Sequence, residues 1–118
     1  MKMNILFFGS SQFAVPSLKA LVASKQKVSC VVTQPDRQKG RGLALAFTPI
    51  KRLALENNLT VYQPQEINSP KTIKTLKSFK PDLFVVIAYG QILSAEILNI
   101  PKIFCINLHA SLLPKYRG

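Results

Sequence analysis

Five short apolar runs, separated by helical or polar stretches, constrain the fold of this 118-residue chain more than any other feature. Each run is almost continuously hydrophobic, which is typical of parallel strands that are buried on both faces. The predicted strands cover residues 4–8, 28–33, 60–62, 82–88 and 103–108. The predicted helices cover residues 13–23, 48 to about 57, a stretch from 69 onward, and 94–98. This alternation predicts one α/β domain over residues 1–118, a Rossmann-like, doubly wound parallel sheet of about five strands.

Two of the predicted helices begin with the same local signal. Thr48-Pro49 and Ser69-Pro70 each place a hydroxyl residue at the N-cap and a proline at the first helical position. The stretch between the second strand and the first of these helices, residues 34–47, is polar and contains glycine, so we predict a loop there.

The ends of the strands carry the candidate functional residues. Ligands of such sheets bind beyond the carboxyl ends of the strands, where residues 9–11, 88–90 and 107–109 lie. Asn107 and His109 are two residues apart at a strand end, so their side chains are predicted on the same face. An amide donor beside a group that titrates near neutrality suits acyl transfer. From these two residues alone, the alternative of a structural role for His109 stays open, because a single histidine beside a strand end is more often structural than catalytic.

The charge balance favours a polyanionic partner. Sixteen lysines and arginines against five acids give a net charge of +11, which creates a positive field over most of the surface. The alternative is a solvated basic surface with no partner. Four lysines have the spacing of one solvated helix face, namely Lys71, Lys74, Lys77 and Lys80.

The predicted loop over residues 34–47 concentrates three of these cations. Arg37, Lys39 and Arg41 are interspersed with Gly40 and Gly42. A backbone of this kind can follow a phosphate strand while the cations neutralise it. The alternative is a disordered surface loop that is basic without binding anything.

Several classes of protein and site are disfavoured. No apolar run reaches the ~18 residues that span a bilayer, and the N-terminus has no signal-peptide pattern, so we predict a cytoplasmic protein without a membrane partner. Cys30 and Cys105 lie in strand-like runs and are predicted to be small buried hydrophobes. No metal site is predicted. The turn at residues 9–11 has one glycine, whereas a dinucleotide fingerprint needs three.

The C-terminal motif carries a family resemblance. Residues 107–118 read Asn-Leu-His-Ala-Ser-Leu-Leu-Pro-Lys-Tyr-Arg-Gly, which resembles the 10-formyltetrahydrofolate-dependent formyltransferase signature Asn-x-His-x-Ser-Leu-Leu-Pro-x-x-Arg-Gly. The resemblance implies that Asn107 and His109 are catalytic. It also implies that the folate site is lined by Ser111, Leu112, Leu113 and Pro114.

Three further segments are similar to the branch of this family that formylates methionyl-tRNA. They are residues 9–18, 34–42 and 88–93. The resemblance implies a pterin-side wall made by Tyr89, Gly90, Gln91 and Ile92. It also implies that Arg37, Lys39 and Arg41 reach the acceptor end of the initiator tRNA. Residues 43–47 depart from that branch, since Leu-Ala-Leu-Ala-Phe replaces its usual lysines and proline, although an apolar tip can still wedge against a terminal base pair.

The resemblance implies transfer of a formyl group from 10-formyltetrahydrofolate to the amino group of methionyl-tRNA, for translation initiation. The folate is a cosubstrate, no metal is needed, and the full-length family is expected to be monomeric. The chain is expected to stop before the last strands of the domain, a catalytic aspartate and a C-terminal tRNA-binding barrel. We therefore expect little or no activity from these residues alone, and an open, aggregation-prone fifth strand.

Three other functions are weighed against this one. The chain could be a non-catalytic module that binds folate or RNA. It could also belong to a sugar-nucleotide formyltransferase, whose histidine motif is very similar, but residues 34–42 argue against that. A purine-pathway formyltransferase is disfavoured because it grips phosphate with a glycine-rich turn at residues 9–11.

Overall fold

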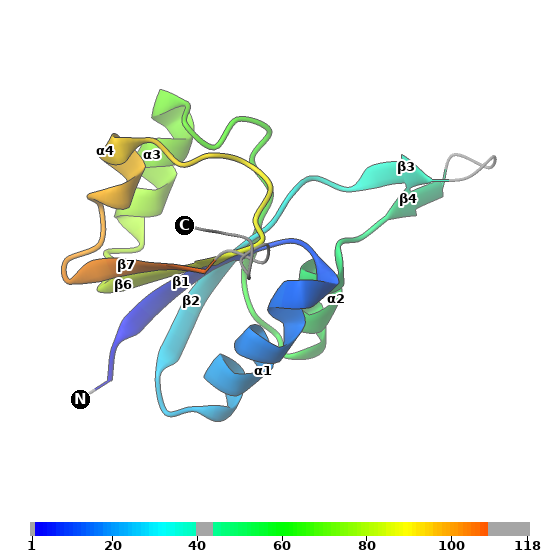
Figure 1. Cartoon of the computed structure of the whole chain (residues 1–118), viewed down its shortest axis with the longest axis horizontal. Coiled ribbons are helices and arrows are strands. Elements are labelled where there is room, and N and C mark those ends of the chain that lie inside the picture. The colour runs from blue at the N-terminus through cyan, green and yellow to red at the C-terminus, as the bar shows by residue number, and fades with distance from the viewer. Residues whose placement is uncertain (1, 40–43, 109–118) are drawn as a thin grey trace, which may run out of the picture.

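The computed structural model describes residues 2–39 and 44–108, and its centre is a five-stranded parallel sheet. The strand order is β5-β2-β1-β6-β7 (Figure 1). The strands are β1 (Asn4–Gly9), β2 (Lys27–Val32), β5 (Val61–Tyr62), β6 (Leu83–Ile87) and β7 (Phe104–Leu108). After β1 the chain adds β2 and β5 on one side of that strand, and it then returns to add β6 and β7 on the other side. This reversal creates a topological switch point between β1 and β6. The predicted Rossmann-like α/β fold is confirmed.

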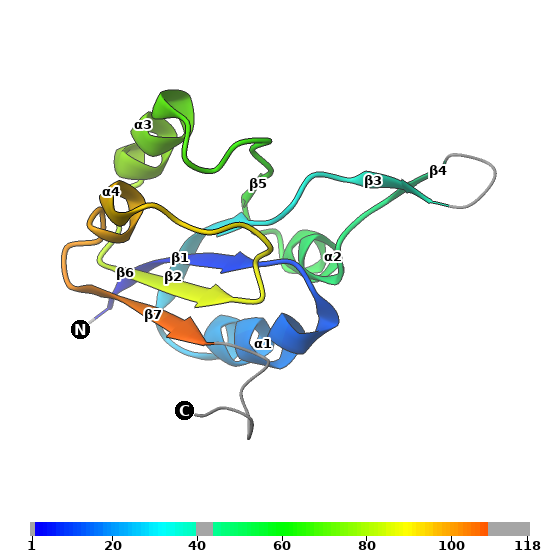
Figure 2. The same cartoon turned by 45° about the horizontal axis from the view of Figure 1, so that its top comes forward.

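Helices cover both faces of this sheet, as Figures 1 and 2 show. On one face lie the 3₁₀ turn η1 (Gln12–Ala14), α1 (Val15–Ala23) and α2 (Pro49–Glu56). On the other lie α3 (Pro70–Ser78) and α4 (Ala95–Leu98). The predicted caps are present, since Thr48 Oγ1 accepts from Lys51 N at 3.0 Å and Ser69 Oγ from Thr72 N at 3.2 Å. None of the helices in the described ranges has the length and apolar character needed to cross a membrane.

The core consists of two apolar clusters, one on each face of the sheet. Alternate residues of β1 supply both, because successive side chains on a strand point to opposite faces. Ile5 and Phe7 pack with α1 and α2, whereas Leu6 and Phe8 pack with α3 and α4. All four side chains are at most 1% exposed. This two-sided burial explains why the strand sequences are continuous apolar runs rather than alternating ones.

Both cysteines belong to this packing. Cys30 is fully buried in β2 and burial raises the pKa of its thiol to about 12. Cys105 is half-buried in β7, and burial raises its pKa as well. Both thiols are free. The prediction of a small buried hydrophobe is confirmed for Cys30, whereas Cys105 packs against the apolar cluster but is only partly buried.

Strand β7 is an edge of the sheet in the described part of the chain. It pairs with β6 on one side. On the face toward α1 and α2, Phe104, Ile106 and Leu108 remain 51%, 36% and 51% exposed. The predicted open and apolar fifth strand is therefore present.

The stretch predicted as a loop contains two strands, and this part of the prediction is wrong. β3 (Arg37–Lys39) and β4 (Ala44–Ala46) pair antiparallel, with Arg37 opposite Ala46 and Lys39 opposite Ala44. Neither strand contains a β-branched or aromatic residue, so strand propensity gives no sign of it. The pair forms an arm that projects away from the body of the domain (Figures 1 and 2).

Candidate active site

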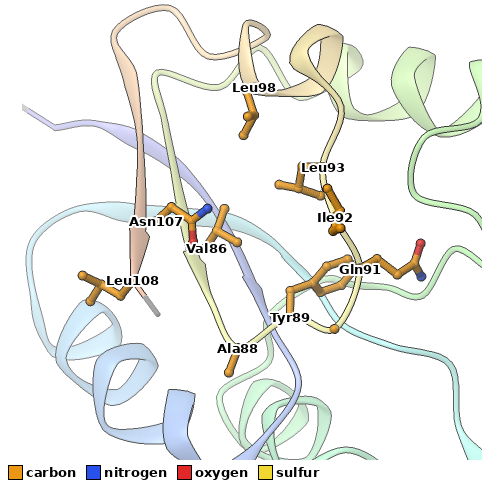
Figure 3. A pocket seen from close by; sticks show the side chains of 10 residues that line it. Val86, Ala88, Tyr89, Gln91, Ile92, Leu93, Leu98, Asn107 and Leu108 are labelled. Atoms are coloured by element: carbon orange, nitrogen blue, oxygen red, sulfur yellow. The ribbon is translucent and has the colours of Figure 1, made fainter. Parts of the chain in front are cut away.

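A cavity of about 510 Å³ opens at the carboxyl ends of β6 and β7. Its walls are the last residues of these strands, the segment after β6 and Leu98 of α4 (Figure 3). Five residues singled out from the sequence line it together, namely Tyr89, Gly90, Gln91, Ile92 and Asn107. The structure therefore brings residues far apart in the chain to one place, at the edge where ligands of such sheets bind.

Asn107 is placed by its strand. It pairs in register with Val86 of β6, and Val86 belongs to the cluster on the α3 and α4 face. The exposed Asn107 side chain therefore lies on that same face, beside Val86 at the cavity wall (Figure 3). The remaining motif residues predicted to act with it lie outside the described residues, namely His109, Ser111, Leu112, Leu113 and Pro114.

The segment after β6 has an unusual backbone that neighbouring residues hold in place. Ala88 and Gly90 have φ angles of 50° and 109°, a region that costs a non-glycine residue roughly 1–2 kcal/mol. The Ala88 carbonyl accepts from Ser10 N at 3.0 Å and from Ser11 N at 3.4 Å. The Ser10 hydroxyl donates to the Tyr89 carbonyl at 2.7 Å. The turn after β1 thus fixes the shape of one cavity wall.

Tyr89 contributes bulk rather than a titrating group. Its side chain is 2% exposed and its ring meets Phe8 edge-on at 5.8 Å. Burial, with a smaller effect of Tyr62, raises the pKa of Tyr89 well above its ordinary value. The phenol is therefore neutral at physiological pH and is poorly suited to proton transfer.

Gln91 lines the cavity, but its amide group is directed elsewhere. Its Oε1 accepts from Ile67 N at 3.1 Å. Its Nε2 donates to Gln34 Oε1 at 2.8 Å and to the Gln65 carbonyl at 3.3 Å. Figure 3 shows this amide pointing away from Asn107. Gln91 thus shapes the wall while its polar atoms bind other parts of the protein.

The base of the β3–β4 arm is held by a separate polar cluster. The Asp36 carboxylate pairs with Lys51 Nζ at 2.9 Å and accepts from Gln63 Nε2 at 2.8 Å. The hydrogen bonds from Lys51 and Gln63 lower the pKa of Asp36. The Lys51 ammonium also lies 3.9 Å from the centre of the Phe47 ring, within range of a cation–π contact.

The structure describes two of the three cations that were predicted to contact phosphates. Arg37 is exposed on β3, and Lys39 ends the same strand. Arg41 lies outside the described residues. Leu45 of β4 is 62% exposed and Phe47 is 40% exposed, so these two residues of the apolar departure lie at the surface.

Sequence reasoning missed Gln34, Lys51 and Gln63 as parts of the site. Gln34 stood within the segment similar to the methionyl-tRNA branch but was given no role. The only local signal was the polar character of Gln34 and Asp36. Their partners in space, Gln91 for Gln34 and Lys51 and Gln63 for Asp36, lie elsewhere in the chain. Within residues 2–39 and 44–108, no group of three acidic, cysteine or histidine side chains could hold a metal ion.

A parallel α/β sheet with a cavity at its carboxyl edge, lined by an amide residue at a strand end, defines a Rossmann-like domain, a class in which small ligands bind at this edge. Comparison with known proteins narrows this class. Residues 1–118 match the sequence model of the family described as formyl transferase, and the chain belongs to that family.

Several similar curated proteins are methionyl-tRNA formyltransferases. A methionyl-tRNA formyltransferase of Clostridium novyi (strain NT) is 59% identical over 117 residues, which is 98% of this chain. A methionyl-tRNA formyltransferase of Thermodesulfovibrio yellowstonii is 55% identical over 118 residues, which is 100% of this chain. The chain spans 38% of the length of each of these relatives.

Solved structures with the same fold include glycinamide ribonucleotide transformylases. Transformylase 1 of Symbiobacterium toebii has a TM-score of 0.65 at 16% identity, over 99% of this chain and 56% of that one. Transformylase 1 of Geobacillus kaustophilus has a TM-score of 0.66 at 18% identity, over 100% of this chain and 63% of that one. At such low identity these likenesses establish the fold alone.

Proposed function

We propose that this chain provides the formyl-donor site of a cytoplasmic enzyme that transfers a formyl group from 10-formyltetrahydrofolate to the amino group of methionyl-tRNA. Membership of the formyl transferase family and the 59% identical relative support the reaction. The observation that carries the proposal is the meeting of Asn107 with residues 89–92 around one cavity. The product serves translation initiation.

The cavity and the residues that line it fit a folate. The volume of the cavity, about 510 Å³, lies in the range of small-molecule sites. Leu93 and Leu98 offer apolar contact to a flat ring, and Asn107 offers a polar group at the far wall. The Ser111–Pro114 stretch would complete this site. The folate supplies an activated formyl group when bound.

Asn107 and His109 are proposed to act on the reacting atoms. The Asn107 amide would donate a hydrogen bond to the oxygen that gains negative charge as the amine attacks, a contact that typically changes rates by about 10²–10³. His109 would relay the proton that the amine loses, because imidazole is the side-chain group that ordinarily exchanges a proton near neutral pH. No metal is part of this scheme.

Both aspartates of the chain have partners of their own. Asp36 is engaged with Lys51 at the base of the arm. Asp82 accepts from Asn4 N at 2.9 Å, at the opposite end of the sheet. We therefore expect little activity from the 118 residues alone, because a catalytic histidine without its orienting carboxylate loses orders of magnitude in rate.

The arm is proposed to bind the acceptor end of the tRNA. Arg37, Lys39 and Arg41 would contact phosphates, and exposed Leu45 would lie against a terminal base pair. The net charge of +11 supports a polyanionic partner. In keeping with the family expectation, the whole enzyme is proposed to work as a monomer.

The test uses a chimera in which residues 1–118 replace the matching segment of the Clostridium novyi relative. The chimera should formylate methionyl-tRNA, and Asn107→Ala should lower kcat by about 10²–10³-fold while tetrahydrofolate still binds. Asn99→Ala is the matched control, since Asn99 is exposed at the end of α4.

Two results would overturn the proposed function. One is a folded chimera that binds folate or RNA but is inactive, which would favour the non-catalytic module. The other is a chimera that formylates an amino sugar nucleotide in preference to methionyl-tRNA. An Asn107→Ala chimera that loses binding and turnover equally would overturn the catalytic role of Asn107.

A further inference from the structure

Gln34 lies where the cavity wall and the base of the arm meet. It follows β2 by two residues and leads into the arm. Its side-chain Oε1 accepts from Gln91 Nε2 at 2.8 Å, although the two residues are 57 positions apart in the chain. Its backbone N donates to the Ser10 hydroxyl at 3.1 Å, and that hydroxyl in turn donates to the Tyr89 carbonyl. Gln34 therefore contacts the wall both directly and through Ser10.

Gln34 is also packed closely against the residue before Gln91. A Cβ atom added to Gly90 would lie 2.7 Å from Gln34 Nε2, a distance that real Cβ contacts do not reach. The amide of Gln34 thus lies against the bare backbone of Gly90. Gln91 also forms hydrogen bonds with Ile67 and Gln65. The cavity wall is therefore contacted by three separate parts of the chain, namely Ser10, Gln34 and residues 65–67.

The same residue is joined to the arm. The Gln34 carbonyl accepts from Gln63 Nε2 at 3.1 Å. Gln63 Nε2 also donates to Asp36, which pairs with Lys51. Polar contacts therefore run without a break from Gln91 in the cavity wall, through Gln34 and Gln63, to the ion pair beneath the arm.

We propose that Gln34 is a positioning residue that ties the folate-binding wall to the base of the arm, so that the two ligands bind with coupled affinities. This inference rests on the proposed function, because it takes the cavity as the folate site and the arm as the tRNA site. A ligand that fixes the wall would favour one position of Gln34 and hence one position of the arm. Linkage requires the effect to be reciprocal, so tRNA must change folate affinity by the same factor.

The experiment measures binding of tetrahydrofolate to the chimera, with and without saturating deacylated initiator tRNA. The parent should bind tetrahydrofolate about fivefold more tightly with tRNA present, at the lower end of typical coupling. Gln34→Met keeps the length of the side chain but removes the acceptor. It should weaken tetrahydrofolate binding about three- to tenfold, as loss of one hydrogen bond does, and should abolish the dependence on tRNA.

Two further variants separate positioning from a general structural role. Gln34→Glu keeps an acceptor for Gln91 Nε2 and should retain the coupling. Gln34→Met combined with Gln91→Met should be no worse than Gln91→Met alone, because Gln91→Met already removes the contact between the two side chains. In turnover, Gln34→Met should raise KM for the folate and leave kcat within about twofold. Gln12→Met is the control, since Gln12 is exposed on η1.

The possible failures can be told apart. If the parent chimera binds both ligands and Gln34→Met preserves their coupling, the positioning role is wrong and the proposed function stands. If Gln34→Met and Gln34→Glu lose affinity equally, packing rather than the hydrogen bond is responsible, and the proposal fails. A folded parent chimera that binds neither ligand would overturn the proposed function, and the coupling with it.

Discussion

The Asp36 carboxylate lies 2.9 Å from the Lys51 ammonium and holds the start of the arm against the first turn of α2. Both side chains are largely shielded, at 19% and 14% exposed. The pair is thus better placed than Lys102 and Asp82, which are 3.9 Å apart with the lysine 75% exposed. The contact explains why an arm that leaves the body of the domain has a fixed base.

This pair makes stability depend on pH at the acid end. Hydrogen bonds from Lys51 and Gln63 lower the pKa of Asp36 in the folded state below its ordinary value of 3.8. The stabilisation is therefore present above that value and is lost as pH falls through the folded pKa. Urea unfolding between pH 7 and pH 2 should show a smaller acid loss for Asp36→Asn than for the parent.

Two lysine substitutions serve as controls for that measurement. Lys51→Met should reduce the same pH dependence, because it removes the main partner of Asp36 and leaves only the Gln63 hydrogen bond. Lys102→Met should leave the curve unchanged, since an exposed pair at 3.9 Å contributes little. Identical curves for the parent and Asp36→Asn would contradict the assignment.

Thr48 is expected to contribute more than an ordinary N-cap. Its Oγ1 accepts from Lys51 N at 3.0 Å and shares a 2.7 Å hydrogen bond with Thr33 Oγ1. Thr48→Ala should lower the free energy of unfolding by about 1–2 kcal/mol, the upper part of the range for caps. Thr75→Ala should have an effect within about 0.5 kcal/mol, because Thr75 lies inside α3, where alanine is well tolerated. Equal effects of the two changes in a thermal melt would rule out the special role of Thr48.

Lys80 offers a stabilising substitution. It follows α3 with a φ of 51°, a conformation that glycine adopts without strain. Lys80→Gly should raise the free energy of unfolding by about 0.5–1 kcal/mol, the relief of strain less the added chain entropy. The Asn4 side chain would keep its hydrogen bond to the carbonyl of residue 80. Lys80→Ala removes the same charge without relieving φ, so a gain in that variant too would point to charge instead.

Sequence patterns predicted those parts of the fold that depend on local chemistry. The apolar runs predicted the central strands because these are buried by helices on both faces, as for Phe7 and Phe8 of β1. The caps at Thr48 and Ser69 were predicted because a hydroxyl and the following proline act within one turn. The arm was not predicted, since pairing between β3 and β4 joins residues with no intrinsic strand preference.

The candidate site was predicted only in its outline. Asn107 and Tyr89 were expected at one edge of the sheet because parallel strands end together there, and Gln91 was expected beside them from the family resemblance. The direction of the Gln91 amide was not foreseeable, because its partner Gln34 is 57 residues away and no local pattern links the two. Contacts of this kind depend on the packed fold rather than on any single segment.

The exposed face of β7 should make the 118-residue chain self-associate. Phe104, Ile106 and Leu108 present a row of apolar side chains on an edge strand, a surface that favours pairing between copies. Phe104→Lys should reduce association in sedimentation velocity, because an edge lysine opposes strand pairing. Ile92→Lys is the control, since Ile92 is 88% exposed but lies outside any strand. A parent chain that sediments as a monomer at all concentrations would contradict this expectation.

Substitution of Arg37 tests whether tRNA contacts the arm specifically or is only attracted by the net charge of +11. Arg37 is exposed on β3, so in the chimera Arg37→Ala should weaken tRNA binding. It should also reduce the slope of log K against log salt by about one, the signature of one lost phosphate contact. Lys71→Ala removes the same charge from exposed α3 on the body of the domain and should change the slope far less. If the two substitutions shift the slope equally, the tRNA responds to the overall charge of the domain, and the arm has no special place in its recognition.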